Sequence, residues 1–203
     1  NINVDAIVCV PQQIDAETLM SIVQNVPVVL VDRAIPDYRC DAVVADSLNA
    51  IYSAMEALFR KQHSRVGLIV GPQDISTARE RLIGYRRVHE DYNIPVDEEL
   101  IQVGNYDLES GYRLFNALMD LKQPPSAVCV TNYDMTVGAI TAAHERGIAL
   151  PEQVDFIGFD NIDLCQVGTP PLPFVEQPME EMGREAARIV LQRLDGGKEP
   201  PQL

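Results

Sequence analysis

The sequence predicts an α/β protein built on parallel sheets flanked by helices, and three observations lead to this class. Apolar, β-branched runs alternate along the 203 residues with stretches whose apolar residues recur at helical spacing. Several runs stop abruptly on polar residues, as buried parallel strands do where they reach the edge of a sheet. Hydrophobic residues make up 46% of the chain, which is enough to build a real core in a globular fold.

Strands and helices alternate through the first half of the chain. Pro27 breaks the first helix, Asn93-Ile94-Pro95 stop the third, and Ser47 is of a residue type that caps helix N-termini. The expected elements are strands at residues 4–10, 28–31, 43–45 and 66–70, and helices at residues 16–25, 47–62 and 75–92.

The same alternation continues in the second half. Asp107 is placed to cap a helix that Pro124 and Pro125 end, and Gly147 suits a left-handed C-cap of the next helix. Successive prolines require residues 169–178 to run extended. The expected elements are strands at residues 101–103, 127–130 and 156–159, and helices at residues 107–123, 133–147 and 179–194.

Polar residues follow five of the apolar runs. Because the carboxyl ends of parallel strands converge on one crevice, Asp and Asn placed there predict a polar ligand site. An Asp at such a place is often only a helix or turn cap, which we expect of Asp46 and Asp74. The polar residues that end the runs are Asp32 and Arg33, Asp46, Asp74, Thr131 and Asn132, and Asp160 and Asn161.

Two breaks in the pattern divide the chain, one near residues 44–47 and one at the extended residues 174–178. Two crossings are what a two-lobed protein needs if its chain leaves one lobe, builds the other and returns. We therefore expect a first lobe of residues 1–45 with 178–203 and a second lobe of residues 46–177. The ligand would then lie between the lobes.

Charge and composition exclude several function classes. The net charge of −14 repels phosphate backbones and anionic membrane surfaces, so this part of the chain is not expected to hold nucleic acid itself. No stretch is apolar for long enough to span a bilayer, and no secretion signal opens the chain. The four cysteines follow no metal-ligand or redox spacing, which predicts a cytoplasmic protein without metal or cofactor.

The sequence favours a binding protein over an enzyme. Neither a Gly-x-Ser-x-Gly turn nor a glycine-rich phosphate loop is present, and the three histidines lie at or near helix ends. Paired carboxylates alone could still serve a glycosidase, so a carbohydrate-active enzyme is kept as a weaker alternative.

Ordered strings along nearly the whole chain carry a family resemblance. They lie at residues 4–7, 26–33, 81–85, 131–139, 147–151, 154–161, 170–172 and 177–183. In order and spacing they resemble the effector-binding core of the LacI/GalR family of bacterial transcriptional regulators. The resemblance implies a two-lobed, periplasmic-binding-protein-like fold that binds a small-molecule effector, such as a sugar or sugar acid.

The resemblance also implies parts and partners beyond this chain. Family members carry an amino-terminal helix-turn-helix and a hinge helix, so DNA would be bound through these and not through this fragment. The first lobe would be incomplete, with its opening strand and helix before Asn1 and a third crossing just past Leu203. A homodimer is expected, with a surface that includes residues 137–141 and 164–169.

Matching the family motif residue by residue implies a set of effector-binding residues. Arg81 falls on the arginine that grips the effector, and its planar fork can hold two hydroxyls or one carboxylate. Asn132 and Asp160 fall on polar positions at two strand ends, where they can bond sugar hydroxyls. Tyr106 falls where members often place an aromatic ring, whose face suits the C–H side of a sugar or a flat base.

The first lobe and the crossing segment complete the implied set. Asp32 is the contribution of the first lobe, Gln177 lies on the crossing segment, and Met179 is a further possible contact. Tyr133 stands where an aspartate usually follows the asparagine, which leaves the identity of the ligand open. Tyr133 could line the site or cover a helix start.

Two of the implied contacts have ordinary structural alternatives. Arg81 could be a solvated helix charge paired with Glu80 or Glu90, and Tyr106 could be plain core. The function expected overall is an effector-sensing core of a transcriptional regulator. A periplasmic-type sugar-binding receptor, which shares the two-lobed fold, is the alternative.

Overall fold

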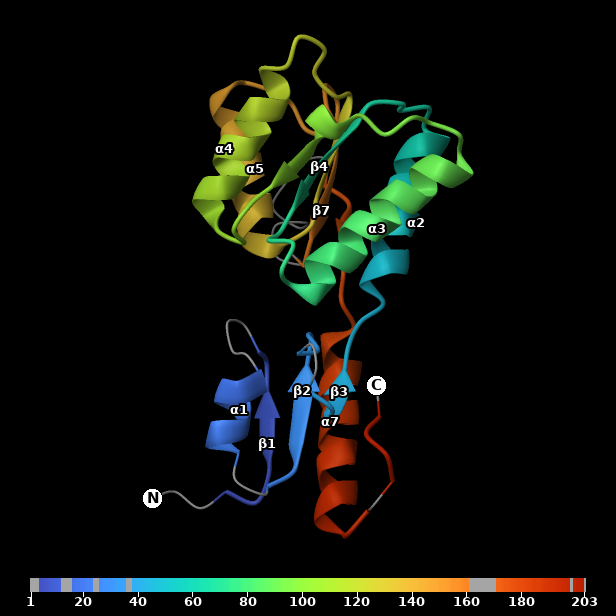
Figure 1. Cartoon of the computed structure of the whole chain (residues 1–203). Coiled ribbons are helices and arrows are strands. Elements are labelled where there is room, and N and C mark those ends of the chain that lie inside the picture. The colour runs from blue at the N-terminus through green and yellow to red at the C-terminus, as the bar shows by residue number, and fades with distance from the viewer. Residues whose placement is uncertain are drawn as a thin grey trace. The chain divides into compact units, whose positions relative to one another are not determined.

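A computed structural model describes residues 4–11, 16–23, 26–35, 38–160, 171–197 and 199–202. The chain divides into two compact units, one of Asn1–Ala45 and Gln177–Leu203 and the other of Asp46–Glu176. Each unit is a parallel sheet with helices on both faces (Figure 1). The predicted α/β class with parallel sheets flanked by helices is therefore confirmed.

The larger unit is built on a sheet in the order β5-β4-β6-β7-β8, in which each neighbouring pair is parallel. The three inner strands are buried along their whole length, which explains why they read as unbroken apolar runs. The strands are β4 (Val66–Val70), β5 (Ile101–Val103), β6 (Ala127–Val130), β7 (Asp155–Phe159) and β8 (Phe174–Val175).

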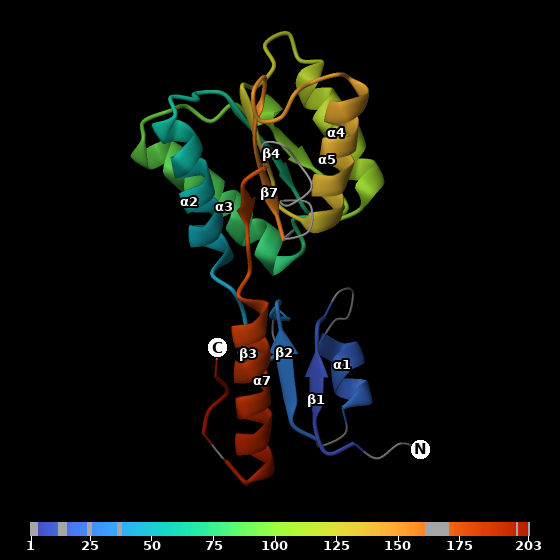
Figure 2. The same cartoon turned by 180° about the vertical axis from the view of Figure 1, so that it is seen from behind.

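Helices cover both faces of this sheet (Figure 2). On one face α2 (Ser47–Arg60) and α3 (Ser76–Asp91) pack on Leu68 and Val70 of β4. On the other face α4 (Leu108–Met119) and α5 (Tyr133–Glu145) pack on Ile69, because successive side chains of a strand point to opposite faces. A short 3-10 helix, Glu98–Leu100, precedes β5 and was not predicted.

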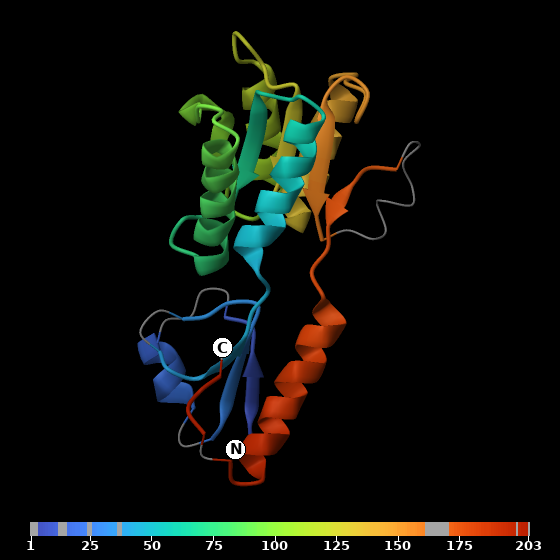
Figure 3. The same cartoon turned by 90° about the vertical axis from the view of Figure 1, so that its right-hand side faces the viewer.

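The smaller unit contains the parallel sheet β1-β2-β3 (Figure 3). Its strands are β1 (Ile7–Cys9), β2 (Val28–Val31) and β3 (Asp41–Val43). Leu19 of α1 (Ala16–Ile22) packs with Leu30 on one face, and Ile189 of α7 (Met179–Leu194) packs with Val29 on the other. Each side chain fully buried in this way contributes about 1.5 to 3 kcal/mol.

The helix caps confirm some expectations and correct others. Asp46 caps α2 with a carboxylate that accepts from Asn49 N at 3.0 Å, so Ser47 is the first helical residue and not the cap. The N-cap of α3 is Ile75 without a side-chain hydrogen bond, so Asp74, which was expected to be a helix or turn cap, does not cap this helix. Asp107 caps α4, and Gly147 follows α5 with φ of 67°, both as expected.

Several boundaries differ from the prediction. The first strand is limited to Ile7–Cys9, the length over which it pairs with β2, and the run at residues 43–45 is replaced by a strand at Asp41–Val43. Residues 171–178 form no helix and contain β8, whereas Thr169 and Pro170 lie outside the described residues. Within the described parts, no helix combines the length and apolarity needed to cross a membrane.

Candidate functional site

The carboxyl edge of the larger sheet holds five of the residues predicted to bind a ligand. Tyr106 lies three residues after β5, Asn132 and Tyr133 follow β6, and Asp160 directly follows β7. Because these strands are parallel, all of these positions lie at the same edge. Arg81 reaches the edge from the second turn of α3.

Arg81 is buried, with a relative exposure of 5%. Its Nη1 donates to the carbonyl oxygen of Thr131 at 2.6 Å, and its guanidinium carbon lies 4.0 Å from the centroid of the Phe159 ring. The alternative of a solvated helix charge is therefore wrong. A guanidinium at a strand edge, held by a carbonyl and an aromatic face, is suited to gripping a polar ligand.

The carbonyl that accepts from Arg81 belongs to a rigid position. Thr131 is fully buried, and both its backbone N and its Oγ1 donate to the carbonyl of Ile69, at 3.0 and 3.1 Å. These bonds continue the ladder between β6 and β4 by one step. Arg81 is thus hydrogen-bonded to a residue that is itself held to β4 by two hydrogen bonds.

Asn132 combines a structural role with its position at the edge. Its Oδ1 accepts from Met135 N at 2.9 Å and so caps α5, while its carbonyl accepts from Thr136 Oγ1 at 2.7 Å. The side-chain oxygen is therefore committed to the helix. A ligand would be met by the amide nitrogen, which can only donate.

Tyr106 closes the end of the sheet over Gly71. A β-carbon built on Gly71 would lie 2.1 Å from Cζ of Tyr106, so the ring occupies space that only glycine leaves open. The ring is half-buried and packs against core residues of both sheet faces, so plain core describes part of its role. Its φ of 62° is a left-handed conformation that a bulky residue rarely adopts.

The two predicted aspartates share that left-handed backbone. Asp160 has φ of 56° and donates its backbone N to Val175 O at 2.9 Å, which ties the edge to β8. Asp32, in the smaller unit, has φ of 72°, donates its backbone N to Val43 O, and pairs with Arg33 at 3.2 Å. Strained non-glycine positions of this kind cluster at functional sites, although Asp tolerates them better than most residues.

Three of the predicted residues are in the smaller unit, and one is exposed at the edge of the larger one. In the smaller unit, Asp32 follows β2 and Gln177 is half-buried. The carbonyl of Gln177 accepts from the backbone N of Met179. Met179 is the first residue of α7 and is 60% exposed. Tyr133 is the first residue of α5 and is 45% exposed. Asn161 lies outside the described residues.

Three residues at the carboxyl edge of the larger sheet were not predicted as site residues: Gly71, Thr131 and Phe159. Thr131 and Phe159 both belong to strings that carry the family resemblance, but nothing within either string indicates that they meet Arg81. The sequence does not reveal the register of β6 against β7. Cys129 of β6 pairs with Ile157 of β7, and Thr131 and Phe159 each follow two residues later, which places them at the same level of the sheet.

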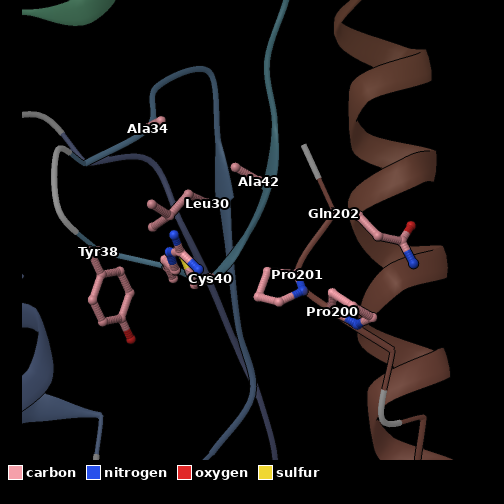
Figure 4. A pocket seen from close by; sticks show the side chains of 9 residues that line it. Leu30, Ala34, Tyr38, Cys40, Ala42, Pro200, Pro201 and Gln202 are labelled. Atoms are coloured by element: carbon pink, nitrogen blue, oxygen red, sulfur yellow. The ribbon is translucent and has the colours of Figure 1, made fainter.

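A pocket of about 390 Å³ lies in the smaller unit (Figure 4). Burial, and then the charge of Asp41, raise the pKa of the Cys40 thiol in its wall to about 11, so the thiol stays protonated and is a poor nucleophile. None of the predicted site residues lines this pocket, so it is separate from the candidate site. Its lining is Leu30, Ala34, Tyr38, Arg39, Cys40, Ala42, Pro200, Pro201 and Gln202.

Three of the four cysteines lie in the described part of the chain. Cys9, Cys40 and Cys129 are free, and Cys165 lies outside that part. Burial raises the pKa of the Cys129 thiol to about 12, while the nearby charge of Arg81 acts in the opposite direction. No group of three or more His, Cys, Asp or Glu among the described residues could hold a metal ion.

Of the surface expected to form a dimer, residues 137–141 are described and residues 164–169 are not. Within the described segment Gly138 and Ala139 are buried, and a β-carbon on Gly138 would lie 2.1 Å from Leu108 O of α4. The segment therefore packs mainly against α4. Val137, Ile140 and Thr141 are its half-buried members.

Comparisons with known proteins agree with this architecture. A family model described as a periplasmic binding protein-like domain matches residues 55–203. The HTH-type transcriptional repressor CytR of Escherichia coli (strain K12) is 36% identical over 170 residues, which cover 84% of this chain and 50% of that protein. The HTH-type transcriptional repressor PurR of Proteus mirabilis (strain HI4320) is 34% identical over 181 residues, which cover 88% of this chain and 53% of that protein.

A solved structure extends the likeness to the fold. The crystal structure of a sugar-binding transcriptional regulator of the LacI family from Escherichia coli, complexed with phosphate, is 31% identical, with a TM-score of 0.83. The match covers 98% of this chain and 72% of that chain. The chain spans about half the length of the curated relatives it matches, and these are transcriptional repressors, not enzymes.

Proposed function

This chain belongs to the periplasmic binding protein-like domain family, as an effector-binding core of the LacI/GalR type, and from this premise we propose that it senses a small sugar or sugar-like effector. The observation that carries the proposal is the placement of Arg81. A buried guanidinium at the carboxyl edge of a parallel sheet, beside two further polar strand ends, is an arrangement for holding a polar ligand.

The chemistry of the edge favours a ligand with both hydroxyls and a flat or C–H face. Arg81 and the amide nitrogen of Asn132 donate, and the carboxylate of Asp160 accepts. The Tyr106 ring offers an aromatic face. Sugars, sugar acids and nucleosides all present these groups, and a related solved structure is that of a sugar-binding regulator.

We propose that the same effector also engages Asp32 and Gln177 of the smaller unit, with Met179 and Tyr133 as further contacts. A ligand that holds both units would favour one of their arrangements by its differential affinity for it. In the whole regulator, a homodimer would pass that change to a helix-turn-helix that binds DNA. The proposed compartment is the cytoplasm, where DNA is bound.

A ligand panel tests the proposal directly. The chain would be screened by thermal shift against D-ribose, D-glucose, D-gluconate, glucose 6-phosphate, cytidine and adenosine, because a ligand that binds only the folded state raises Tm by mass action. We expect at least one compound to raise Tm in a concentration-dependent way, and Arg81→Ala to abolish that shift. The matched control is Arg87→Ala, an exposed arginine on the same helix.

A panel in which no compound changes Tm would contradict the sugar-like class of ligand. A ligand whose effect survives Arg81→Ala would contradict the assignment of the site.

A further inference from the structure

We infer that Phe159 is a positioning residue, whose ring aims the Arg81 guanidinium at the effector. The inference rests on the proposed function, because it assigns Arg81 to effector binding. It adds a residue that acts through Arg81 and not by touching the ligand.

The geometry gives the guanidinium two supports of different kinds. The guanidinium carbon lies over the Phe159 ring, 4.0 Å from its centroid, and the Thr131 carbonyl accepts from one of the guanidinium nitrogens at 2.6 Å. A ring face limits tilt but not rotation in the plane, whereas the hydrogen bond limits rotation. Together they define the direction in which the remaining N–H groups point.

Both supports come from neighbouring strand ends that are themselves fixed. Phe159 is 1% exposed, and its backbone N donates to Thr136 Oγ1 at 3.3 Å. That hydroxyl in turn donates to the carbonyl of Asn132, the residue after Thr131. The ring and the carbonyl are therefore linked through one threonine.

A long cationic side chain without such supports would lose rotamer entropy when it binds a ligand. Ordering a rotamer-rich side chain lowers binding affinity, and a guanidinium already held against a ring avoids much of that loss. Preorganisation by Phe159 is thus expected to appear in ligand affinity as well as in fold stability.

The first test needs no ligand. The full chain, labelled with ¹⁵N-arginine, would be examined by NMR, with the Arg81 Nε–Hε signal assigned through Arg81→Lys. In the unmodified chain we expect this signal to be shifted by the ring current and to report an ordered side chain. Phe159→Leu should remove both properties.

Phe156→Leu is the matched control. Phe156 is equally buried in the same strand but packs on the opposite face of the sheet, in the core that does not contain Phe159. Phe156→Leu should leave the Arg81 signal unchanged. An Arg81 signal that is insensitive to Phe159→Leu would overturn the inference.

If Phe159→Leu does not fold, pentafluorophenylalanine at position 159 keeps the shape of the ring and reverses the charge of its face. We then expect the guanidinium to become mobile. An Arg81 signal that stays ordered beside the fluorinated ring would equally overturn the inference.

The second test measures affinity by calorimetry, using whichever of cytidine and D-ribose binds. Phe159→Leu should weaken binding of the probe about five- to thirtyfold. Phe159→Tyr, which keeps an aromatic ring face, should bind the probe as tightly as the unmodified chain does. In an Arg81→Ala background, Phe159→Leu should have no further effect, because coupled residues are not additive. An equal loss with and without Arg81 would mean that Phe159 acts through something else.

The two tests separate the possible failures. If neither probe binds, the NMR experiment still decides whether Phe159 holds Arg81, and only the proposed function is put at risk. If a probe binds but Arg81→Ala does not weaken it, the assignment of Arg81 to the effector fails, and the positional part of the inference is judged on the NMR result.

Discussion

Asp41 and Arg193, which belong to the two separate sequence segments of the smaller unit, form a bidentate ion pair in which both hydrogen bonds are 2.7 Å long. Asp41 begins β3 and Arg193 lies in the last turn of α7, so the pair joins the sheet to the helix that returns to it. Asp41 also accepts from Gln202 N at 2.9 Å, and Arg193 donates to Glu199 O at 2.8 Å. One ion pair therefore orders three segments of this unit.

Replacing Asp41 by Asn should destabilise the smaller unit strongly. The carboxylate side chain is 7% exposed and its partner 12%, so the substitution removes the hydrogen-bonded counter-charge of a buried guanidinium and leaves it only the more distant carboxylate of Glu199, at 3.8 Å. We expect a loss of about 3 kcal/mol in the free energy of unfolding, measured by urea denaturation. Glu185→Gln, which breaks an exposed pair with Arg188 on the same helix, should change the urea midpoint little. Equal effects of the two substitutions would contradict the structural role given to Asp41.

The same pair predicts a dependence of stability on pH. The hydrogen bonds from Arg193 hold the pKa of Asp41 below its usual value, although burial opposes them. The stabilisation is then fully present above the unfolded-state pKa of about 3.9 and is lost as the pH falls through the lower folded-state pKa. The advantage of the unmodified chain over Asp41→Asn should be constant above about pH 5 and shrink below about pH 4, in unfolding measured as a function of pH. A difference in the free energy of unfolding between the two proteins that increased on acidification would contradict this prediction.

Gly71→Ala should displace the Tyr106 ring. The new methyl group would lie within 2.2 Å of two ring carbons, so the ring must move, at a cost of about 1 to 3 kcal/mol in the free energy of unfolding. A ligand that the ring contacts should bind more weakly, which calorimetry would measure. Gly183→Ala is the matched substitution, because Gly183 lies in α7 with nothing within 4 Å of its added β-carbon. It should stabilise the chain by about 0.5 to 1 kcal/mol.

Arg81→Lys tests whether charge alone is sufficient at that position. Lysine keeps the charge and much of the buried stem, but it has no planar fork to share between a carbonyl, a ring face and a ligand. We expect effector affinity to fall by about 1.5 to 3 kcal/mol, the worth of a charge-assisted hydrogen bond. Calorimetry on this variant and on Arg87→Lys, an exposed position of the same helix, makes the comparison. Full affinity in Arg81→Lys would show that the planar fork is not needed.

The sequence predicts most of the strands and helices of the larger unit, but not the 3-10 helix Glu98–Leu100. The strands Val66–Val70, Ile101–Val103 and Ala127–Val130 have the predicted limits. Val66–Val70 and Ala127–Val130 are inner parallel strands that are buried on both faces, so apolar residues run along their whole length. The short β1 was predicted too long, because the β-branched residues Val4 and Val10 lie beyond the paired residues and remain exposed.

The contacts of the candidate site are less accessible to sequence reasoning. A lone arginine on a helix is solvated by default, and the burial of Arg81 depends on Thr131 and Phe159, each some fifty or more residues away. Local patterns carry no information about such pairs, which arise from the register of two strands. The family resemblance selected Arg81 where periodicity alone could not.

The left-handed backbone at Asp32, Tyr106 and Asp160 lowers stability at three residues whose side chains belong to the proposed effector site. Glycine at any of the three would relax the local chain, most of all at the bulky tyrosine, while deleting a carboxylate or a ring that the proposed effector would touch. Selection for thermal stability alone would therefore favour glycine at these positions, and it would produce a protein that is more stable but no longer responds to the effector. The positions that change to glycine in such a selection would identify which of the three side chains are kept for ligand binding and not for stability.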